Sequence, residues 1–338
     1  MDIELVTPGD EARLRAWWEV EDAARRADAP WLPTNPVQEL LLEDDSNRRS
    51  SRRERHAAVL DGRVVGGLVL ELPLLDNIET LIATVMVHPD HRRHGIGRQL
   101  FDHAVARAHH ERRPLLIGEV AEPLDVATVA PGAAFATSVG GRRALSEICR
   151  ALDLDTALDH RLSALAETSR QHAAGYELVQ WAGPAPDELV DDLARLQALM
   201  STDAPLDDLQ WSPEVWDAAR IREGEEEAAA KERVWVTTGA RHVASGRLVA
   251  YTDIGVSIHL PGTSFQWTTI VDRKHRGHRL GMLVKTANIA LLAAHCPGVR
   301  RVITWNAETN DHMVAINEEM GFQKVGRWAE WQLEVPPA

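Results

Sequence analysis

The sequence is poor in cysteine and tyrosine, and both shortages narrow what it can encode. Its two cysteines, Cys149 and Cys296, form no C-x-x-C pair and no disulfide framework, which predicts a reducing, cytoplasmic environment. Its two tyrosines, Tyr176 and Tyr251, leave few phenolic groups for acid–base chemistry. No apolar stretch approaches the roughly 18 residues of a membrane span, and the first residues lack the pattern of a secretory signal. We therefore expect a cytoplasmic protein that does not cross a membrane.

The charge balance is acidic. The chain carries 37 Lys and Arg against 51 Asp and Glu, a formal net charge of −14. Binding to a nucleic-acid backbone or an anionic membrane depends on an excess of basic residues, so this balance argues against both partners. A small neutral or cationic substrate fits better. With 338 residues, the chain is long enough for two domains, each with its own core.

An internal repeat supports two domains. Residues 85–100 are VMVHPDHRRHGIGRQL, and residues 269–284 are TIVDRKHRGHRLGMLV. Aligned at their arginines, the two segments share a histidine, an arginine, a second histidine and a glycine: His91, Arg92, His94 and Gly97 in the first copy, His275, Arg276, His278 and Gly281 in the second. A duplicated domain explains a repeat of this length better than a solenoid of short units does.

The surroundings of the two segments repeat as well. Each is preceded by two alternating apolar runs joined by a turn, Asp61-Gly62 in one copy and Ser245-Gly246 in the other, which predicts a β-hairpin. Each is followed by a helical stripe and a further strand. We predict an α/β fold with mixed sheets: an N-terminal domain at 1–152, a linking helix at 153–173, and a C-terminal domain at 174–338.

The glycine-containing loop is where chemistry is expected. Gly95 and Gly97 permit a tight turn and leave no side chain in the way. The backbone N–H groups at the start of the following helix then point at one position, backed by the positive end of the helix. Such a loop suits a pyrophosphate.

This segment resembles motif A of the Gcn5-related N-acetyltransferase (GNAT) family, [QR]-x-x-G-x-[GA] after a strand. Arg92, Gly95 and Gly97 fill it in the first copy, whereas Arg279 replaces the first glycine in the second. The resemblance implies two tandem GNAT domains and acetyl-CoA as co-substrate, with the preceding strand lining its pantetheine. It assigns cofactor contacts in the first copy to Val85, Val87, Arg92, Arg93, His94, Gly95, Ile96, Gly97 and Arg98. In the second copy it assigns them to Val271, Arg276, Gly277, His278, Arg279, Leu280 and Gly281.

A later family motif, N-x-x-[AM]-x-x-x-Y-x-x-x-G-F, is better kept in the second copy. Asn310, Met313, Asn317 and Gly321-Phe322 fit its spacing, downstream of Asn306. The resemblance implies that Asn306 and Asn310 contact the pantetheine or acetyl end. The tandem arrangement is similar to the double-unit acetyltransferases of actinobacteria, which include mycothiol synthase. We favour the second copy for catalysis because its asparagine motif is intact.

The acid and base of the reaction are less defined. In the family the acceptor amine attacks the thioester directly, and a tyrosine usually protonates the leaving thiolate. Asn317 occupies that position in the second copy, and Tyr251 lies on a strand that could line the acceptor side, so these two are the catalytic candidates. Water can serve in place of an acid, because a CoA thiolate leaves readily. Candidate bases by position are Glu79, Glu119, Asp253 and His259.

Three histidines in the first loop, His88, His91 and His94, have metal-ligand chemistry but lie in the predicted phosphate loop, so we expect no metal. The favoured function is transfer of an acetyl group from acetyl-CoA to a small-molecule amine, by a monomer or homodimer. One alternative is a pseudoenzyme that binds acyl-CoA as a sensor. Another is a GNAT-fold transferase with a different donor, such as aminoacyl-tRNA.

Overall fold

The computed structural model describes residues 1–43, 48–125 and 127–335. The chain forms two compact units. Unit 1 comprises Met1–Glu147, Leu206–Ser212 and Val325–Ala338, and unit 2 comprises Ile148–Pro205 and Pro213–Lys324.

Unit 1 is built on a mixed sheet. Its strands are β1 (Asp2–Val6), β2 (Ser51–Leu60), β3 (Arg63–Pro73), β4 (Thr80–Val87), β5 (Leu115–Glu122), most of β12 (Gln323–Glu334) and the first half of β6 (Arg142–Asp153). Its helices are α1 (Glu11–Asp28), α2 (Val37–Leu42), α3 (Ile96–Glu111) and α4 (Pro131–Ser138), with a 3-10 turn at Pro89–His91. The strand order is β1-β2-β3-β4-β5-β12-β6.

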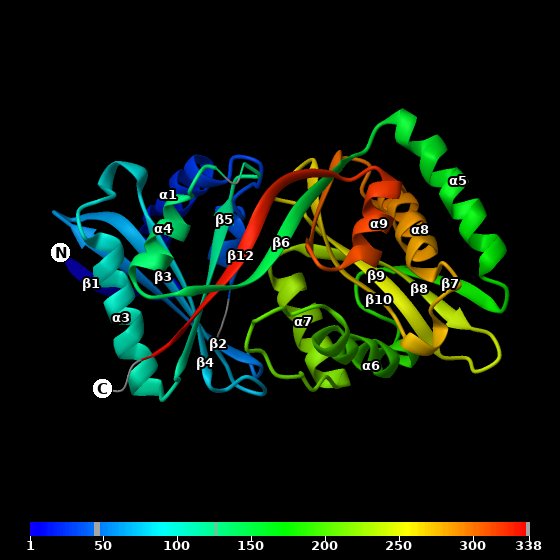
Figure 1. Cartoon of the computed structure of the whole chain (residues 1–338), viewed down its shortest axis with the longest axis horizontal. Coiled ribbons are helices and arrows are strands. Elements are labelled where there is room, and N and C mark those ends of the chain that lie inside the picture. The colour runs from blue at the N-terminus through cyan, green and yellow to red at the C-terminus, as the bar shows by residue number, and fades with distance from the viewer. Residues whose placement is uncertain (44–47, 126, 336–338) are drawn as a thin grey trace. The chain divides into compact units, whose positions relative to one another are not determined.

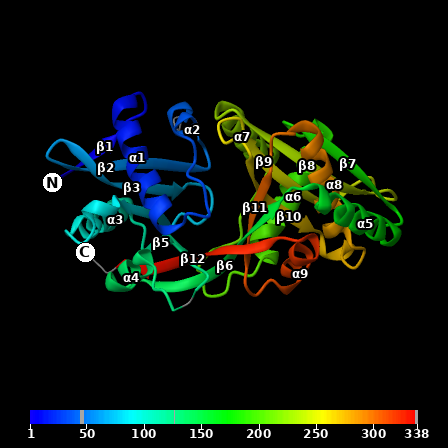
Figure 2. The ribbon, with the colours of Figure 1, turned by 90° about the horizontal axis from the view of Figure 1, so that it is seen from above.

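Helices cover both faces of the first sheet, with α1 and α3 on opposite sides (Figure 2). The apolar stripe of α3, including Leu100 and Ala104, packs on residues of β3 and β4. On the other face, Trp17 of α1 packs against β2 and donates its indole N–H to the carbonyl of His56. The predicted hairpin is confirmed, because β2 and β3 are joined at Asp61 and Gly62, which both have a positive φ.

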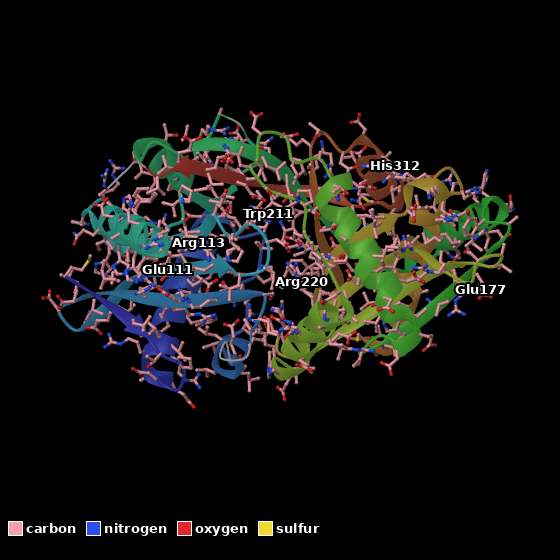
Figure 3. The ribbon with its side chains drawn as sticks, turned by 90° about the horizontal axis from the view of Figure 1, so that it is seen from below. Glu111, Arg113, Glu177, Trp211, Arg220 and His312 are labelled. Atoms are coloured by element: carbon pink, nitrogen blue, oxygen red, sulfur yellow. The ribbon has the colours of Figure 1, made fainter. Side chains whose placement is uncertain are left out.

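The end of α3 is tied to the strands that follow it. Arg113, labelled beside Glu111 in Figure 3, is buried and donates to the carbonyls of Pro73 and Thr80, at 2.8 and 3.2 Å. These bonds fix the end of β3 and the start of β4 to the turn before β5. Burial lowers the pKa of the Arg113 guanidinium.

Unit 2 repeats this plan. Its strands are the second half of β6, β7 (Tyr176–Ala182), β8 (Arg233–His242), β9 (Leu248–Ser257), β10 (Thr263–Val271) and β11 (Arg301–Ala307). Its helices are α5 (Thr156–His172), α6 (Asp187–Asp203), α7 (Ala218–Ala230), α8 (Leu280–His295) and α9 (Asp311–Met320), with a 3-10 turn at Arg273–His275. The strand order is β6-β11-β10-β9-β8-β7.

In unit 2, α8 and α9 lie on one side of the strands and α6 and α7 on the other (Figure 1). Ile254 and Met282 belong to the core beneath α8, whereas Tyr251 and Leu193 belong to the core beneath α6. Leu158 and Leu162 of α5 join the α8 core. At the start of α7, the guanidinium of Arg220 (labelled in Figure 3) lies 4.3 Å from the ring centroid of Trp216.

The last strand of each repeat lies in the sheet of the other. Strand β12 follows α9 along the chain, but its residues Arg327–Glu334 pair antiparallel with β5 of unit 1. Strand β6 follows α4, and its second half lies beside β11 in unit 2. The predicted repeat boundaries at 1–152, 153–173 and 174–338 remain a prediction about the duplication, because compactness groups the two exchanged strands differently.

The α/β fold predicted from the sequence is confirmed. Among the helices of residues 1–43, 48–125 and 127–335, none has the length and apolar character needed to cross a membrane.

Candidate functional site

The loop between β4 and α3 has an alternating backbone. Arg93 and Gly95 both adopt the left-handed conformation, with φ of 65° and 81°, and Gly95 is the N-cap of α3. A Cβ built on Gly95 would meet nothing nearer than the Gln99 amide at 3.9 Å, so the space above the loop is open. Helix N–H groups in the first turn have no intrahelical acceptor. This loop can therefore present donors and a positive helix end to an anion.

The loop between β10 and α8 has the same alternation with the glycine exchanged. Gly277 has φ of 84°, and Arg279, the N-cap of α8, has φ of 52°. Each copy thus places one glycine and one arginine at the two left-handed positions, in opposite order. A left-handed residue other than glycine costs roughly 1–2 kcal/mol. Arg279 accepts this cost, and because it keeps the positive φ of the glycine at that position, the second loop follows the same course as the first.

The arginine shared by the two repeats holds each loop in place. The guanidinium of Arg92 forms two 2.8 Å bonds to Asp28, the last residue of α1, and its Nε donates to the Val87 carbonyl. Arg276 does the same, donating to the Val271 carbonyl at 3.3 Å and to Asp203, the last residue of α6, at 2.6 Å. Both side chains are committed to protein partners in this state.

The other predicted loop residues divide into exposed and packed ones. Arg93, His94, Gly277 and His278 are exposed, and Arg98 is exposed and paired with Asp102 at 2.8 Å. Ile96 and Leu280 are buried in the cores and offer the loop their backbone alone. Gly97 and Gly281 are packing positions, since a Cβ on Gly97 would lie 3.5 Å from Phe135 and one on Gly281 3.2 Å from Ile316. Arg279 is paired with Glu319 of α9 at 3.0 Å.

The two parallel strands beside each loop pair only at their beginnings. Over the described residues, β4 pairs with β5 through Thr80–Ile82, and β10 pairs with β11 through Thr263–Phe265. Val85, Val87 and Val271, predicted to line pantetheine, lie beyond the paired part. Each also packs in part on the core beneath the following helix.

Strand β10 also contains an irregularity. Its register with β9 shifts between Gln266 and Thr269, which marks a β-bulge. The equivalent strands β3 and β4 keep one continuous register from Gly66 opposite Val87 to Glu71 opposite Ile82. Only the second of the two loop-bearing strands is bulged over its described pairing.

The predicted asparagines stabilise α9 and its contact with β11. Asn310 is the N-cap of α9 and accepts a bond from the Met313 N–H at 3.2 Å. Asn317 is fully buried and donates to Asn306, while its own Oδ1 has no hydrogen-bond partner among the described residues. Their roles in cofactor binding, and that of Asn317 in catalysis, remain predictions.

A titratable group lies on β9 beside the bulge. Asp253 accepts a 2.7 Å bond from the Thr268 N–H within the bulge, and burial raises its pKa to about 7. Tyr251, two residues earlier, is buried, donates to Gln197 of α6, and has its pKa raised by burial and by Asp253. Because residues two apart on a strand share a face, both side chains lie on the α6 side of the sheet.

The remaining candidate bases are placed differently. Glu79 is exposed just before β4, and His259 is bonded to Glu232 at 2.7 Å. Glu119 of β5 lies directly opposite Glu330 of β12. Its side chain reaches solvent, yet the protein around it disfavours charge and raises its pKa. Desolvation followed by repulsion from other glutamates raises the pKa of Glu330 to about 8.

Sequence reasoning missed several residues of these sites. Asp28 and Asp203, which hold the loop arginines, lie in helices far from the loops in sequence, and no motif marks them. The environment of Asp253 depends on a bulge that the alternation of apolar residues does not reveal. Within the part of the chain that the structure describes, no three or more His, Cys, Asp and Glu side chains group so as to hold a metal ion.

Comparison with known proteins agrees with this architecture. Residues 15–128 match the acetyltransferase (GNAT) family. A solved tandem GNAT protein from the clavulanic acid biosynthesis pathway superposes with a TM-score of 0.82 at 29% identity, covering 100% of this chain and 99% of that one. A GCN5-related N-acetyltransferase from Sphaerobacter thermophilus shares the fold at 14% identity and a TM-score of 0.67, covering 100% and 96%. No curated protein matches the chain by sequence.

Residues 15–128 therefore match the GNAT family, and the whole chain has the fold of a tandem GNAT protein, as its internal repeat predicted. This fold supports transfer of an acyl group to an amine.

Proposed function

We propose that the chain is an N-acetyltransferase that moves an acetyl group from acetyl-CoA to the amine of a small molecule, and that unit 2 performs the chemistry. The observation that carries this proposal is the position of Asp253. Its carboxyl contacts the bulge of β10, the strand that pairs with β11 only at its beginning. Its pKa of about 7 suits a general base near neutral pH. In unit 1 the equivalent of Asp253 is Val69, which has no proton to exchange.

The residues of both loops fit a pyrophosphate. Gly277 and Gly95 leave open space above the backbone, and the first N–H groups of α8 and α3 point toward it. In unit 2, Arg279 adds a guanidinium that can pair with phosphate in place of Glu319. Acetyl-CoA bound there supplies the activated thioester.

The chain then contributes position and proton transfer. Asp253 as carboxylate accepts a proton from the acceptor's ammonium, and the freed amine attacks the thioester carbon. The new C–N bond forms as the C–S bond breaks, the nitrogen passes its second proton to solvent, and the thiolate takes a proton from water. We assign stabilisation of the developing oxyanion to backbone N–H groups of β10 next to the bulge. Tyr251, whose pKa is raised further above neutrality, is held by Gln197 beside Asp253 and orders this face of the site.

The decisive experiment blocks one loop at a time. Gly277→Trp and Gly95→Trp both fill open space at a glycine of positive φ, and Gly175→Trp does so outside both loops. We expect Gly277→Trp to abolish acetylation of an amine panel and to remove one calorimetric acetyl-CoA site, whereas Gly175→Trp retains both. Loss of turnover in Gly95→Trp alone would move the chemistry to unit 1. Failure of the wild type to bind acetyl-CoA would overturn the donor and favour another one.

Unit 1 keeps the phosphate loop but has Val69 in place of the base, which favours a binding role for that unit. A second acetyl-CoA site lost only in Gly95→Trp would demonstrate that role. A likeness to mycothiol synthase in particular and a cytoplasmic location remain predictions from the sequence.

A further inference from the structure

Unit 2 carries a group of aromatic side chains that the proposed acetyl transfer does not use. Phe265 and Trp305 are stacked, with ring centroids 5.8 Å apart and planes at 19°. Trp267 lies 6.0 Å from Trp305. We call these three residues, with Trp235, the aromatic floor.

Gly255 lies between the aromatic residues of the floor and leaves room for their rings. Trp235 of β8 is the register partner of Gly255 on β9, and Phe265 of β10 is the partner of Gly255 on its other side. A Cβ built on Gly255 would lie 3.2 Å from Trp235 and 3.3 Å from Trp267. Any side chain there would push the rings apart, so the glycine keeps the four aromatic residues together across β8 to β11.

The floor is open to solvent and adjoins the proposed base. Trp267 is 54% exposed, which is a large fraction for tryptophan, a residue type that is highly buried on average. Asp253 lies two residues before Gly255 on the same face of the strand and bonds the N–H of Thr268, the neighbour of Trp267. The floor is therefore adjacent to Asp253 and offers a surface for the body of an amine bound there.

Three of the equivalent positions in unit 1 are charged, whereas the equivalent of Phe265 is the apolar Ile82. Along the strand registers, Trp235, Gly255 and Trp305 correspond to Arg53, Glu71 and Glu119. Arg53 and Glu71 form a 2.8 Å ion pair. The aromatic floor is thus a property of unit 2 and is not imposed by the strands.

We propose that the aromatic floor binds the body of the acceptor, and that the acceptor is a primary amine on a short chain attached to an aromatic ring. This rests on the proposed function. A flat apolar ring gains stacking and burial on such a surface, and its ammonium gains from nearby ring faces. A polyhydroxylated amine needs hydrogen-bonding partners for its hydroxyl groups, and the ring faces of the floor supply none.

The test compares an aromatic, an aliphatic and a polyhydroxylated primary amine on variants of one exposed residue. The probes are 2-phenylethylamine, n-hexylamine and D-glucosamine, assayed for acetylation and for binding without the acetyl donor. Trp267→Ala is expected to raise both the Kd and the KM for 2-phenylethylamine about three- to tenfold. We expect n-hexylamine to change less than twofold and Trp267→Phe to restore most of the loss. Val243→Ala, which removes an apolar side chain 60% exposed in the β8–β9 turn, serves as the control.

The outcomes separate the inference from the proposed function. Acetylation that prefers glucosamine, or that is indifferent to Trp267→Ala, overturns the aromatic acceptor while acetyl transfer stands. Binding of 2-phenylethylamine that is lost in Trp267→Ala and kept in Trp267→Phe, without any acetylation, supports the floor and removes the proposed function. Equal binding by all three variants overturns the floor.

Discussion

The two units have the same loop backbone built from different residues, and they differ on the strand face where an acceptor would lie. In unit 1, Arg93 and Gly95 occupy the left-handed positions, and in unit 2, Gly277 and Arg279 do so. The arginine that anchors each loop to a helix-terminal aspartate is kept in both. The family motif expects glycine at the position of Arg279, but the loop needs only a positive φ there. Arginine can adopt that φ at some cost in backbone strain, so the absence of glycine does not mean that the loop is lost.

The faces beside the loops differ in chemistry and in strand geometry. Unit 1 has an ion-paired face with carboxyls of raised pKa and a regular β3–β4 register, whereas unit 2 has an aromatic face, a bulge and a single carboxyl in contact with that bulge. The two copies therefore share the loop backbone more closely than the strand face beside it. This difference supports the proposed placing of catalysis in unit 2 more specifically than the asparagine motif does, since Asn310 and Asn317 stabilise α9.

The largest expected effect comes from removing the proposed base. Asp253→Asn keeps the shape and the bond from Thr268 but cannot take a proton, so kcat/KM should fall roughly 10²- to 10⁴-fold. Steady-state acetylation of an amine panel measures this. The matched control is Glu330→Gln, which neutralises a carboxyl of raised pKa in unit 1 and should leave kcat/KM within about twofold. Equal losses in both variants would contradict the assignment.

The pH profile sharpens the same comparison. Because Asp253 must be ionised to act, kcat/KM should rise with pH and level off above its pKa of about 7. Residual activity of Asp253→Asn should lack this limb. A limb of the same midpoint that persists in the variant would assign the titration to another group.

Local features of the fold were predictable from the sequence because short-range physics determines them. The hairpin at Asp61 and Gly62, the stripe of α3 and the two glycine loops each depend on neighbours in the chain. Their repetition at a fixed spacing then indicated two domains. In the candidate site, the loop residues followed from this pattern.

Features that depend on distant partners were not predictable. The exchange of β6 and β12 depends on which sheet edge each strand meets, and the alternation of apolar residues is the same in either sheet. The aromatic floor joins three strands that are separated in sequence, and its four rings have no common spacing. Lys285 is buried on α8 above the Phe322 ring, at a position that the apolar stripe would leave to solvent.

A moderate effect is expected from restoring glycine to the second loop. Arg279→Gly relieves the left-handed strain and removes the pair with Glu319, so stability should change by less than about 1 kcal/mol. If the guanidinium pairs with phosphate, the KM for acetyl-CoA should rise about three- to tenfold. Arg112→Gly, which removes an exposed arginine of positive φ at the C-cap of α3 and outside both loops, is the matched control. A lower KM for acetyl-CoA in Arg279→Gly would mean that open backbone matters more than the added charge.

The smallest effect concerns the stability of the charged face of unit 1. Desolvation and then repulsion from Glu119 and Glu147 raise the pKa of Glu330 from 4.5 to about 8. A carboxyl whose folded pKa is raised stabilises the protein fully below its unfolded pKa, and that contribution is lost as pH rises through the folded value. The Tm of the wild type should therefore fall between pH 5 and pH 9, and Glu330→Gln should lessen the fall by roughly 2–4 °C, measured by calorimetry. Glu334→Gln, exposed at the end of the same strand, should keep the wild-type slope. If Tm changes with pH by the same amount in all three proteins, Glu330 ionises without a cost to stability. The two faces would then differ in their residues, but the charged face of unit 1 would carry no electrostatic penalty.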